Sequence, residues 1–300
     1  MADVEIVLHP IPSADSKPYI IAYGPDRHLW FCESGASKIG RMNPADGSCV
    51  EFNTPTPESK PIGITLAADG ALWFCENAGH KIGRITAAGE IREFPVRTPG
   101  AGPDGCVAGP DGNVWFSEAH LSRIGRITPR GEVTEFSQGL TPGCRPLSPV
   151  VRDGDIWFSE YAAGQIGRIS MDGHVTEYKI PTPNAEPRAM ATHPDGSIWF
   201  VETKANALGR IDAAGRITEW PVTTPDASLR GVTVAPDGEL WCTENFANKI
   251  GRMSPDGKVI GEYAIPGALC GARCIIAIPD GRLFFSAHDT GAIGEVIPRR

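Results

Sequence analysis

"LWFCESGASKIGR", residues 29–41, is the first of seven related stretches in this 300-residue chain. Each stretch contains an aromatic anchor, and successive anchors lie 42 or 43 residues apart. The anchors are Trp30, Trp73, Trp115, Trp157, Trp199, Trp241 and Phe284. Repeats of this length are typical of β-propeller blades. The sequence therefore predicts an all-β protein, a seven-bladed β-propeller that occupies residues 1–300 as a single domain.

Each repeat contains four short segments with the composition of β-strands. Around the "LWFxE" segment lie an apolar run such as "GVTVA" (231–235), a "KIGRI"-like segment and a segment such as "ITEWPV" (217–222). Asp-Gly pairs between them favour tight hairpin turns. The seventh repeat ends before a fourth strand, and "VEIVLHPIP" (4–12) resembles the fourth-strand segments. We therefore expect four-stranded blades, with the N-terminal strand completing blade seven and closing the ring.

Composition narrows the classes of partner. The net charge is −8 with both signs mixed along the chain, which argues against a surface for nucleic acid. No apolar run approaches the roughly 20 residues of a membrane span. The start "MADVEIVLHP" has no basic segment followed by an apolar one, and the eight cysteines show no zinc-type spacing. We expect a monomeric cytoplasmic protein with reduced thiols that acts on a small molecule, without nucleic acid or membrane.

A charged pattern accompanies the repeat. Six repeats carry a glutamate after the aromatic segment and an arginine in the next strand, as Glu33 and Arg41 do in the first. The seventh repeat has Ala287 and Glu295 instead. Because losing one member of a buried ion pair is costly, a joint loss suggests that the two groups are partners. We therefore predict a structural Glu–Arg pair within each of six blades.

The variable positions of the repeat indicate where a site would lie. Function on a symmetric scaffold resides where the symmetry fails, and the loops that enter the innermost strands meet around the axis. Eleven residues before each anchor, this ring of positions holds Tyr19, Ile62, Asp104, Pro146, Arg188, Arg230 and Arg273. Arg145 and Glu186 lie beside it.

Three of these arginines come from consecutive blades. Arginine forks suit bidentate binding of a carboxylate or phosphate, so the cluster of Arg188, Arg230 and Arg273 favours an anionic ligand or a developing oxyanion. Two other interpretations stay open: the arginines pair with Asp104, Glu186 or Asp226, or they are solvated at the rim.

A second variable ring ends the second strands, at Ser34, Asn77, Ala119, Tyr161, Thr203, Asn245 and His288. The sequence does not determine on which face of the propeller this second ring lies. His288 is its titratable member and is a candidate general base, against the alternative of an ordinary hydrogen-bonded histidine. Cys106, Cys144 and Cys270 lie near the first ring, where arginines could activate a thiol, but no Cys–His pair is evident.

The "WFxE…KIGRI" unit and the "E(F/Y)xIPTP" blade exit, in seven copies, resemble the streptogramin B lyase family, also called the virginiamycin B lyase family. The resemblance covers essentially the whole chain. It implies a seven-bladed propeller that linearises cyclic depsipeptide antibiotics by elimination at an ester bond, with Mg²⁺ and a histidine base, and so a role in antibiotic resistance for the family.

The site residues that the resemblance implies are only partly present. The family's early tyrosine matches Tyr19 in "KPYII". Its sixth-blade substrate-binding histidine falls on Arg230 in "LRGV", and its seventh-blade metal-binding glutamate and catalytic histidine fall on Gly271 and Arg273 in "GARCI". Its last metal-binding glutamate falls on Ala287 or His288. The closest relic of the motif is "AEPRAM", with Glu186 and Arg188.

These departures favour a diverged, metal-independent enzyme of lyase or isomerase type that acts on a small carboxylate-bearing substrate. Arginine is a poor general base at neutral pH, and Gly271 and Arg273 offer no side-chain oxygen to Mg²⁺. Tyr19, His288 and Arg273 are the predicted catalytic residues. The predicted substrate-binding residues are Arg188, Arg230, Asp104, Arg145 and Glu186, and no metal or other cofactor is expected. The alternatives are an authentic streptogramin lyase and a non-catalytic propeller that binds an anionic metabolite or a peptide.

Overall fold

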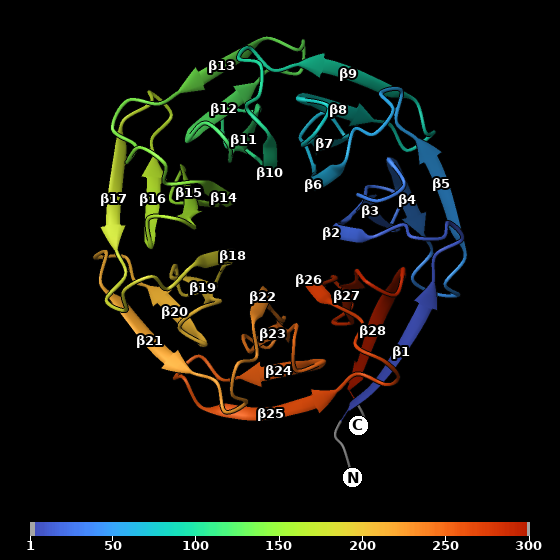
Figure 1. The fold of residues 1–300 in the computed structure, drawn as a ribbon, viewed down its shortest axis with the longest axis vertical. Coiled ribbons are helices and arrows are strands. Elements are labelled where there is room, and N and C mark those ends of the chain that lie inside the picture. The colour runs from blue at the N-terminus through green and yellow to red at the C-terminus, as the bar shows by residue number, and fades with distance from the viewer. Residues whose placement is uncertain (1–3, 299–300) are drawn as a thin grey trace.

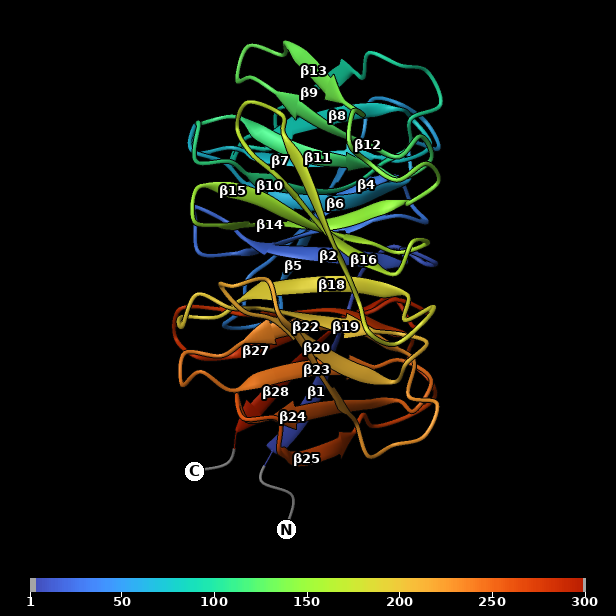
Figure 2. The same ribbon diagram turned by 90° about the vertical axis from the view of Figure 1, so that its left-hand side faces the viewer.

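The chain forms a ring of seven four-stranded antiparallel sheets, which confirms the seven-bladed β-propeller (Figure 1). The structure is a computed structural model, and it describes residues 4–298. Seen edge-on, the inner strands run close to the direction of the ring axis and the outer strands are inclined to it (Figure 2), as the right-handed twist of β-sheets requires. No segment of residues 4–298 forms a helix of the length and hydrophobicity that a membrane crossing needs.

Every blade has the same strand order from the axis outward. The innermost strands are β2 (Pro18–Tyr23), β6 (Pro61–Leu66), β10 (Pro103–Ala108), β14 (Pro146–Arg152), β18 (Pro187–Thr192), β22 (Leu229–Val234) and β26 (Ala272–Ala277). The second strands are β3 (Leu29–Glu33), β7 (Leu72–Glu76), β11 (Val114–Glu118), β15 (Asp155–Glu160), β19 (Ile198–Glu202), β23 (Leu240–Glu244) and β27 (Leu283–Ala287). The third strands are β4 (Lys38–Met42), β8 (Lys81–Ile85), β12 (Arg123–Ile127), β16 (Gln165–Ile169), β20 (Ala207–Ile211), β24 (Lys249–Met253) and β28 (Ala292–Pro298). The outermost strands are β5 (Cys49–Asn53), β9 (Ile91–Pro95), β13 (Val133–Phe136), β17 (Val175–Lys179), β21 (Ile217–Pro221), β25 (Val259–Ala264) and β1 (Val4–Pro10).

The ring closes as the repeat pattern predicts. Strand β1 pairs antiparallel with β28, in register from Val4 opposite Pro298 to Pro10 opposite Ala292. The two ends of the chain therefore share one blade, and β28 is not left as an open edge.

Stacked aromatic side chains fill the outer half of six blades. In blade one, Trp30 of the second strand stacks on Phe52 of the fourth strand, with ring centroids 5.6 Å apart. The same pairing recurs up to Trp241 and Tyr263, at 5.9 Å. Such large, fully buried side chains account for the invariant Trp spacing, because each one fills the same place in its blade.

The prediction of a Glu–Arg pair within each of six blades is wrong. The strand register places Arg41 opposite Trp30, and it places Glu33 opposite Lys38. Arg41 pairs instead with Asp26, in the turn before the second strand, with Arg41 Nε 2.7 Å from Asp26 Oδ2. The guanidinium also lies over the Trp30 ring. The arginine therefore holds a turn to the blade's aromatic core, three residues away from the glutamate.

The charged group that acts on each buried glutamate is a second glutamate, on the fourth strand of the same blade. Burial and, secondarily, the nearby Glu51 carboxylate raise the pKa of Glu33 to about 8. Glu51 is held by the preceding blade, because it accepts hydrogen bonds from Ser13 N and Ser13 Oγ, each at 2.8 Å. In blade seven the two equivalent positions are Ala287 and Leu8. Blade seven therefore lacks both carboxyl groups of this pair.

The arginine position of blade seven is also rebuilt, with its charges exchanged. Glu295 stands where the other blades carry arginine, opposite Phe284. Arg282, in the turn before β27, approaches it with Arg282 Nη1 3.5 Å from Glu295 Oε1. His9 of β1 adds a contact of 3.2 Å between its Nε2 and Glu295 Oε2. The N-terminal strand therefore adds a polar contact to blade seven besides its backbone pairing.

The buried glutamates predict a stability that falls at alkaline pH. Burial and the nearby Glu177 raise the pKa of Glu160 from 4.5 to about 9. The unfolded chain releases this proton near pH 4.5 while the folded chain keeps it, so the stabilising contribution is complete below that pH and is lost as the pH rises toward 9. We expect Glu160→Gln to leave the melting temperature unchanged at pH 4.5 and to raise it by roughly 3–5 °C at pH 8.5.

Calorimetry at the two pH values checks this expectation. The exposed Glu132 supplies the control, because Glu132→Gln should alter neither melting temperature. A Glu160→Gln variant that melts below the parent at pH 8.5 would mean that this carboxyl group is ionised in the folded chain.

Candidate functional site

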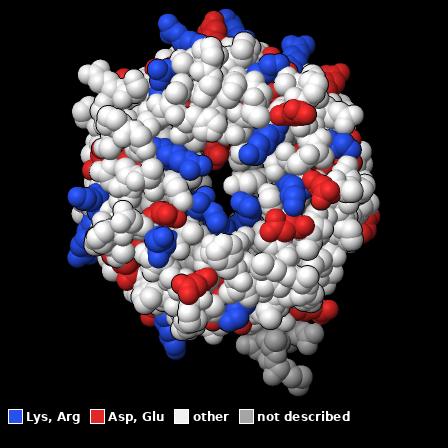
Figure 3. Space-filling view, in the orientation of Figure 1, with Lys and Arg blue, Asp and Glu red and all other residues white. Residues whose placement is uncertain are grey.

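A cavity of about 270 Å³ lies on the ring axis and is lined by residues of the innermost strands. Five of the seven first-ring positions line it: Tyr19, Asp104, Arg188, Arg230 and Arg273. At the other two positions the neighbouring Gly63 and Leu147 line it in place of Ile62 and Pro146. The space-filling view shows an opening at the centre of the ring with Lys and Arg side chains around it (Figure 3).

The backbone turns sharply into each innermost strand. The residue just before the strand has a positive φ in every blade, as in Lys17 (51°), Arg145 (56°) and Glu186 (54°). At position 271 there is a second reason for glycine, because a Cβ there would lie 2.2 Å from Asp289 Oδ2. The Asp289 carboxylate thus takes the space into which a side chain at position 271 would project.

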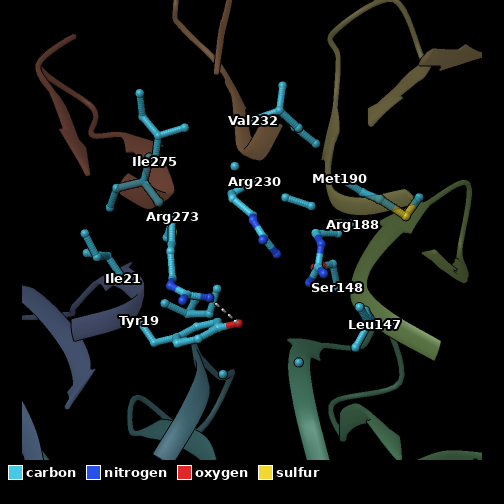
Figure 4. Close-up of a pocket in the computed structure, with 18 of the residues that line it drawn as sticks. Tyr19, Ile21, Leu147, Ser148, Arg188, Met190, Arg230, Val232, Arg273 and Ile275 are labelled. Atoms are coloured by element: carbon cyan, nitrogen blue, oxygen red, sulfur yellow. Dashed lines mark hydrogen bonds between the residues drawn. The ribbon is translucent and has the colours of Figure 1, made fainter. Parts of the chain in front are cut away.

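The three ring arginines point into the cavity without saturating their hydrogen-bonding groups (Figure 4). The Nε atoms of Arg188, Arg230 and Arg273 are buried and have no hydrogen-bond partner among residues 4–298. Burial and then the charges of Arg188 and Arg273 lower the pKa of Arg230. These Nε atoms are neither paired with an acid among residues 4–298 nor solvated, so each guanidinium group beside the cavity keeps an unpaired N–H donor.

Tyrosine rings support the two outer arginines. The Arg188 guanidinium carbon lies 4.3 Å from the centroid of the Tyr161 ring, and that of Arg273 lies 5.1 Å from the centroid of Tyr19. Arg273 Nη1 also donates a 3.5 Å hydrogen bond to the Tyr19 hydroxyl. Cation–π contacts of this kind hold a guanidinium in place and leave its edge free for a ligand.

Arg145 and Glu186 do not line the cavity but surround Tyr161. Arg145 lies over the Tyr161 ring at 5.2 Å, on which Arg188 also packs. The Tyr161 hydroxyl donates a 2.8 Å hydrogen bond to Glu186 Oε2. The two predicted substrate-binding residues therefore position Tyr161, and through it Arg188. No role for Tyr161 was predicted from the sequence, although its place in the second variable ring was a signal.

The second variable ring lies at the same end of the propeller as the first. Backbone hydrogen bonds join it to the residues just before the innermost strands, as from Ser34 N to Lys17 O at 3.2 Å. His288 packs edge-on against Tyr19, with ring centroids 5.7 Å apart. His288 does not line the cavity. Its Nδ1 lies 2.8 Å from Asp289 Oδ1, and its Nε2 has no hydrogen-bond partner among residues 4–298. Asp289 was not among the site residues predicted from the sequence, although it follows His288 directly.

The environment of His288 favours the neutral form of the imidazole by lowering its pKa. Burial lowers its pKa, the hydrogen bond to Asp289 opposes that effect, and the charge of Arg273 adds to the lowering. A neutral imidazole with one nitrogen fixed by a carboxylate is the usual form of a general base.

We expect the pKa of His288 to lie below 6.5. Because Asp289 raises it, Asp289→Asn should move it further down. A ¹H–¹³C NMR titration of the histidine ring signals measures both values, with His288→Gln used for assignment. The control is Asp256→Asn in an exposed turn, which should leave the His288 titration unchanged. An upward shift in Asp289→Asn would contradict the assigned contact.

Asp104 faces the cavity from the strand β10. Burial raises its pKa to about 6, against the opposing charges of Arg145, Arg188 and Lys60. Its strand carries none of the three ring arginines, although the charge of Arg188 acts on it.

The cysteines do not provide an activated thiol. All eight are free, and burial raises the pKa of Cys144 to about 12 and that of Cys270 to about 11. The Cys106 thiol donates to Trp73 O at 3.4 Å. Since the thiolate is the nucleophile, the structure contradicts a nucleophilic role for Cys144 and Cys270.

The family's magnesium site does not fit the residues present. Residues 4–298 contain no cluster of three or more His, Cys, Asp or Glu side chains that could hold a metal. Position 271 is a glycine whose side-chain space is taken by Asp289, and position 287 is a buried alanine. Mg²⁺ requires oxygen ligands, and Arg273 places a cation where the family resemblance implies the catalytic histidine.

Comparisons with known proteins agree with this architecture. A model of the virginiamycin B lyase family matches residues 2–199 and 140–299. A structure described as streptogramin B lyase is 32% identical, with a TM-score of 0.92 and coverage of 98% of this chain and 97% of the other. Virginiamycin B lyase from Staphylococcus aureus is 34% identical, with a TM-score of 0.92 and coverage of 98% and 99%.

A catalytically inactive variant of the Staphylococcus aureus enzyme, with one histidine replaced by alanine and with quinupristin, matches to the same extent. Among curated proteins, none matches this chain significantly. The family model spans both halves of the ring, and the identity to these solved structures exceeds 30% over nearly the whole chain. The chain therefore belongs to the virginiamycin B lyase family.

Proposed function

We propose that this protein is a lyase- or isomerase-type enzyme that binds a small carboxylate-bearing molecule in the axial cavity. The observation that carries the proposal is the set of buried, unpartnered Nε atoms on Arg188, Arg230 and Arg273. Three neighbouring cations that make no salt bridge within residues 4–298 are unfavourable unless an anion completes them. A bound carboxylate would accept their free N–H groups in the planar geometry that guanidinium favours.

The chemistry proposed for this site is proton removal next to the bound carboxylate. His288, which is fixed by Asp289 and packs against Tyr19 just outside the cavity lining, takes the proton of the adjacent carbon at its Nε2. The C–H electron pair forms a carbon–carbon double bond, and the bond to a leaving oxygen on the next carbon breaks. Tyr19, which accepts a hydrogen bond from Arg273, donates its own proton to that oxygen. The arginines stabilise the negative charge that develops on the carboxylate during proton removal.

The test uses 3-acetoxybutanoate as the probe, in D₂O and followed by ¹H NMR. We expect exchange of the hydrogens next to the carboxylate, or release of acetate with formation of but-2-enoate, and neither with 3-acetoxybutanamide. Both signals should be lost in His288→Gln. Binding without exchange or elimination for any β-acyloxy acid tested would overturn the catalytic part and leave an anion-binding propeller.

A separate arm tests the reaction of the family. Quinupristin is incubated with the protein, with and without Mg²⁺, and the linear product is sought by mass spectrometry. We expect none, because the residues at positions 271, 273 and 287 supply neither the metal ligands nor the histidine that the family resemblance implies. Linearisation under either condition would overturn the proposed substrate class.

A further inference from the structure

Beyond the arginine side chains, the wall of the axial cavity becomes apolar. Ile21, Leu147, Met190, Val232 and Ile275 line it, one from each of five innermost strands (Figure 4). Each of them is at least 93% buried. Burial of a ligand's hydrocarbon against such a wall is favourable at about 25 cal/mol per Å².

The charges around the cavity are unevenly distributed. The three arginines whose Nε atoms lack a hydrogen-bond partner within residues 4–298 come from the strands β18, β22 and β26 of consecutive blades. Asp104 lines the cavity from β10, outside that group of strands. A ligand with its carboxylate on the arginines would bring a second carboxylate toward the apolar wall or toward Asp104, and both are unfavourable for a buried anion.

We infer that the ligand is an amphipathic monocarboxylate, with its carboxylate on Arg188, Arg230 and Arg273 and its hydrocarbon part against Met190, Val232 and Ile275. This inference rests on the proposed function and names its substrate class. The cavity volume of about 270 Å³ lies near the lower end of the range for small-molecule sites, so it suits a short alkyl chain or one aromatic ring.

Calorimetric titration of the full chain with acids of increasing length tests the inference. The probes are acetate, butanoate, hexanoate and 3-phenylpropanoate, with adipate as the six-carbon dicarboxylate. We expect affinity to rise up to about fourfold for each added methylene until the cavity is full. Adipate should bind at least tenfold more weakly than hexanoate.

Two variants locate the hydrocarbon part. Met190→Gln keeps the length of the methionine side chain, and Val232→Thr keeps the shape of the valine side chain. If one of the two variants does not fold, the other still tests the inference. Each should reduce the affinity for hexanoate about tenfold and leave that for acetate unchanged. Met171→Gln, outside the cavity lining, is the matched control and should change neither.

The outcomes separate the inference from the proposal beneath it. If acetate, hexanoate and adipate bind alike, or if both cavity variants that fold keep the preference for hexanoate, the inference is wrong and the anion site remains. If no carboxylate binds at any length, the proposed function fails and the inference fails with it.

Discussion

Arg230→Met is expected to weaken the binding of hexanoate by about 100-fold and, at the same time, to raise the melting temperature. Arg230 lies between Arg188 and Arg273, and burial together with those two charges already lowers its pKa. Its charge-assisted hydrogen bonds to a carboxylate are worth about 1.5–3 kcal/mol each in binding, where tenfold corresponds to about 1.4 kcal/mol. Without a ligand the same charge is only a cost, because it is half-buried and faces two others of its own sign.

Methionine is the substitution of choice because it removes the charge and keeps an unbranched side chain. We expect the melting temperature of the ligand-free variant to rise by roughly 2–4 °C. Binding of hexanamide, which lacks the charge, should be unaffected. Arg216→Met, at a side chain that is 80% exposed, is the control and should alter neither quantity.

A result in which Arg230→Met is destabilised would show that the guanidinium is satisfied in the free protein. Equal losses for hexanoate and hexanamide would show that the residue shapes the cavity without recognising charge. Calorimetry for stability and for binding, on the same preparations, distinguishes these outcomes from the expected one.

The ring of cavity residues was predictable from the sequence because the repeat length is nearly constant. A strand advances by a fixed rise per residue, so positions eleven residues before each anchor aromatic reach equivalent places on every blade. Tyr19 and Arg230 line the cavity as this count predicts. Pro146 misses because the connection from β14 to β15 is one residue shorter than in blade one: Trp157 pairs with Val150, seven residues before it, whereas Trp30 pairs with Ala22, eight residues before it. Leu147 therefore takes the equivalent place in the lining.

Contacts between side chains far apart in the sequence were not predictable in this way. The loss of Glu and Arg from the same repeat suggested a pair, but sequence spacing does not show that Glu33 and Arg41 lie three residues apart along the register. The actual partner, Glu51, is held by Ser13 of the preceding blade. Likewise, Asp289 acquires its role only because Gly271 leaves space for its carboxylate.

Removal of residues 1–10 is expected to abolish cooperative folding. Strand β1 is the outermost strand of blade seven and pairs with β28 over seven residues. Val4 is buried in the core of that blade, and Ile6 and Leu8 pack against it. Loss of three such side chains costs on the order of 5 kcal/mol, which is comparable to the whole stability of a typical protein. The deletion also exposes β28 as an unpaired edge, so the product should aggregate on heating.

A circular permutant separates loss of the strand from loss of its connection. A chain that begins at Ser13 and carries residues 1–12 after residue 300 would join β28 to β1 as a hairpin through five residues, because Pro298 and Val4 are already opposite each other. We expect this permutant to melt as one cooperative unit, within a few degrees of the parent, and to bind hexanoate. Cooperative unfolding of the deleted chain near the parent's melting temperature would show that six blades and three strands suffice. That outcome would place the stability of the ring in the inter-blade contacts of Ser13, Thr56 and their equivalents with the fourth-strand glutamates, and not in the closure of blade seven.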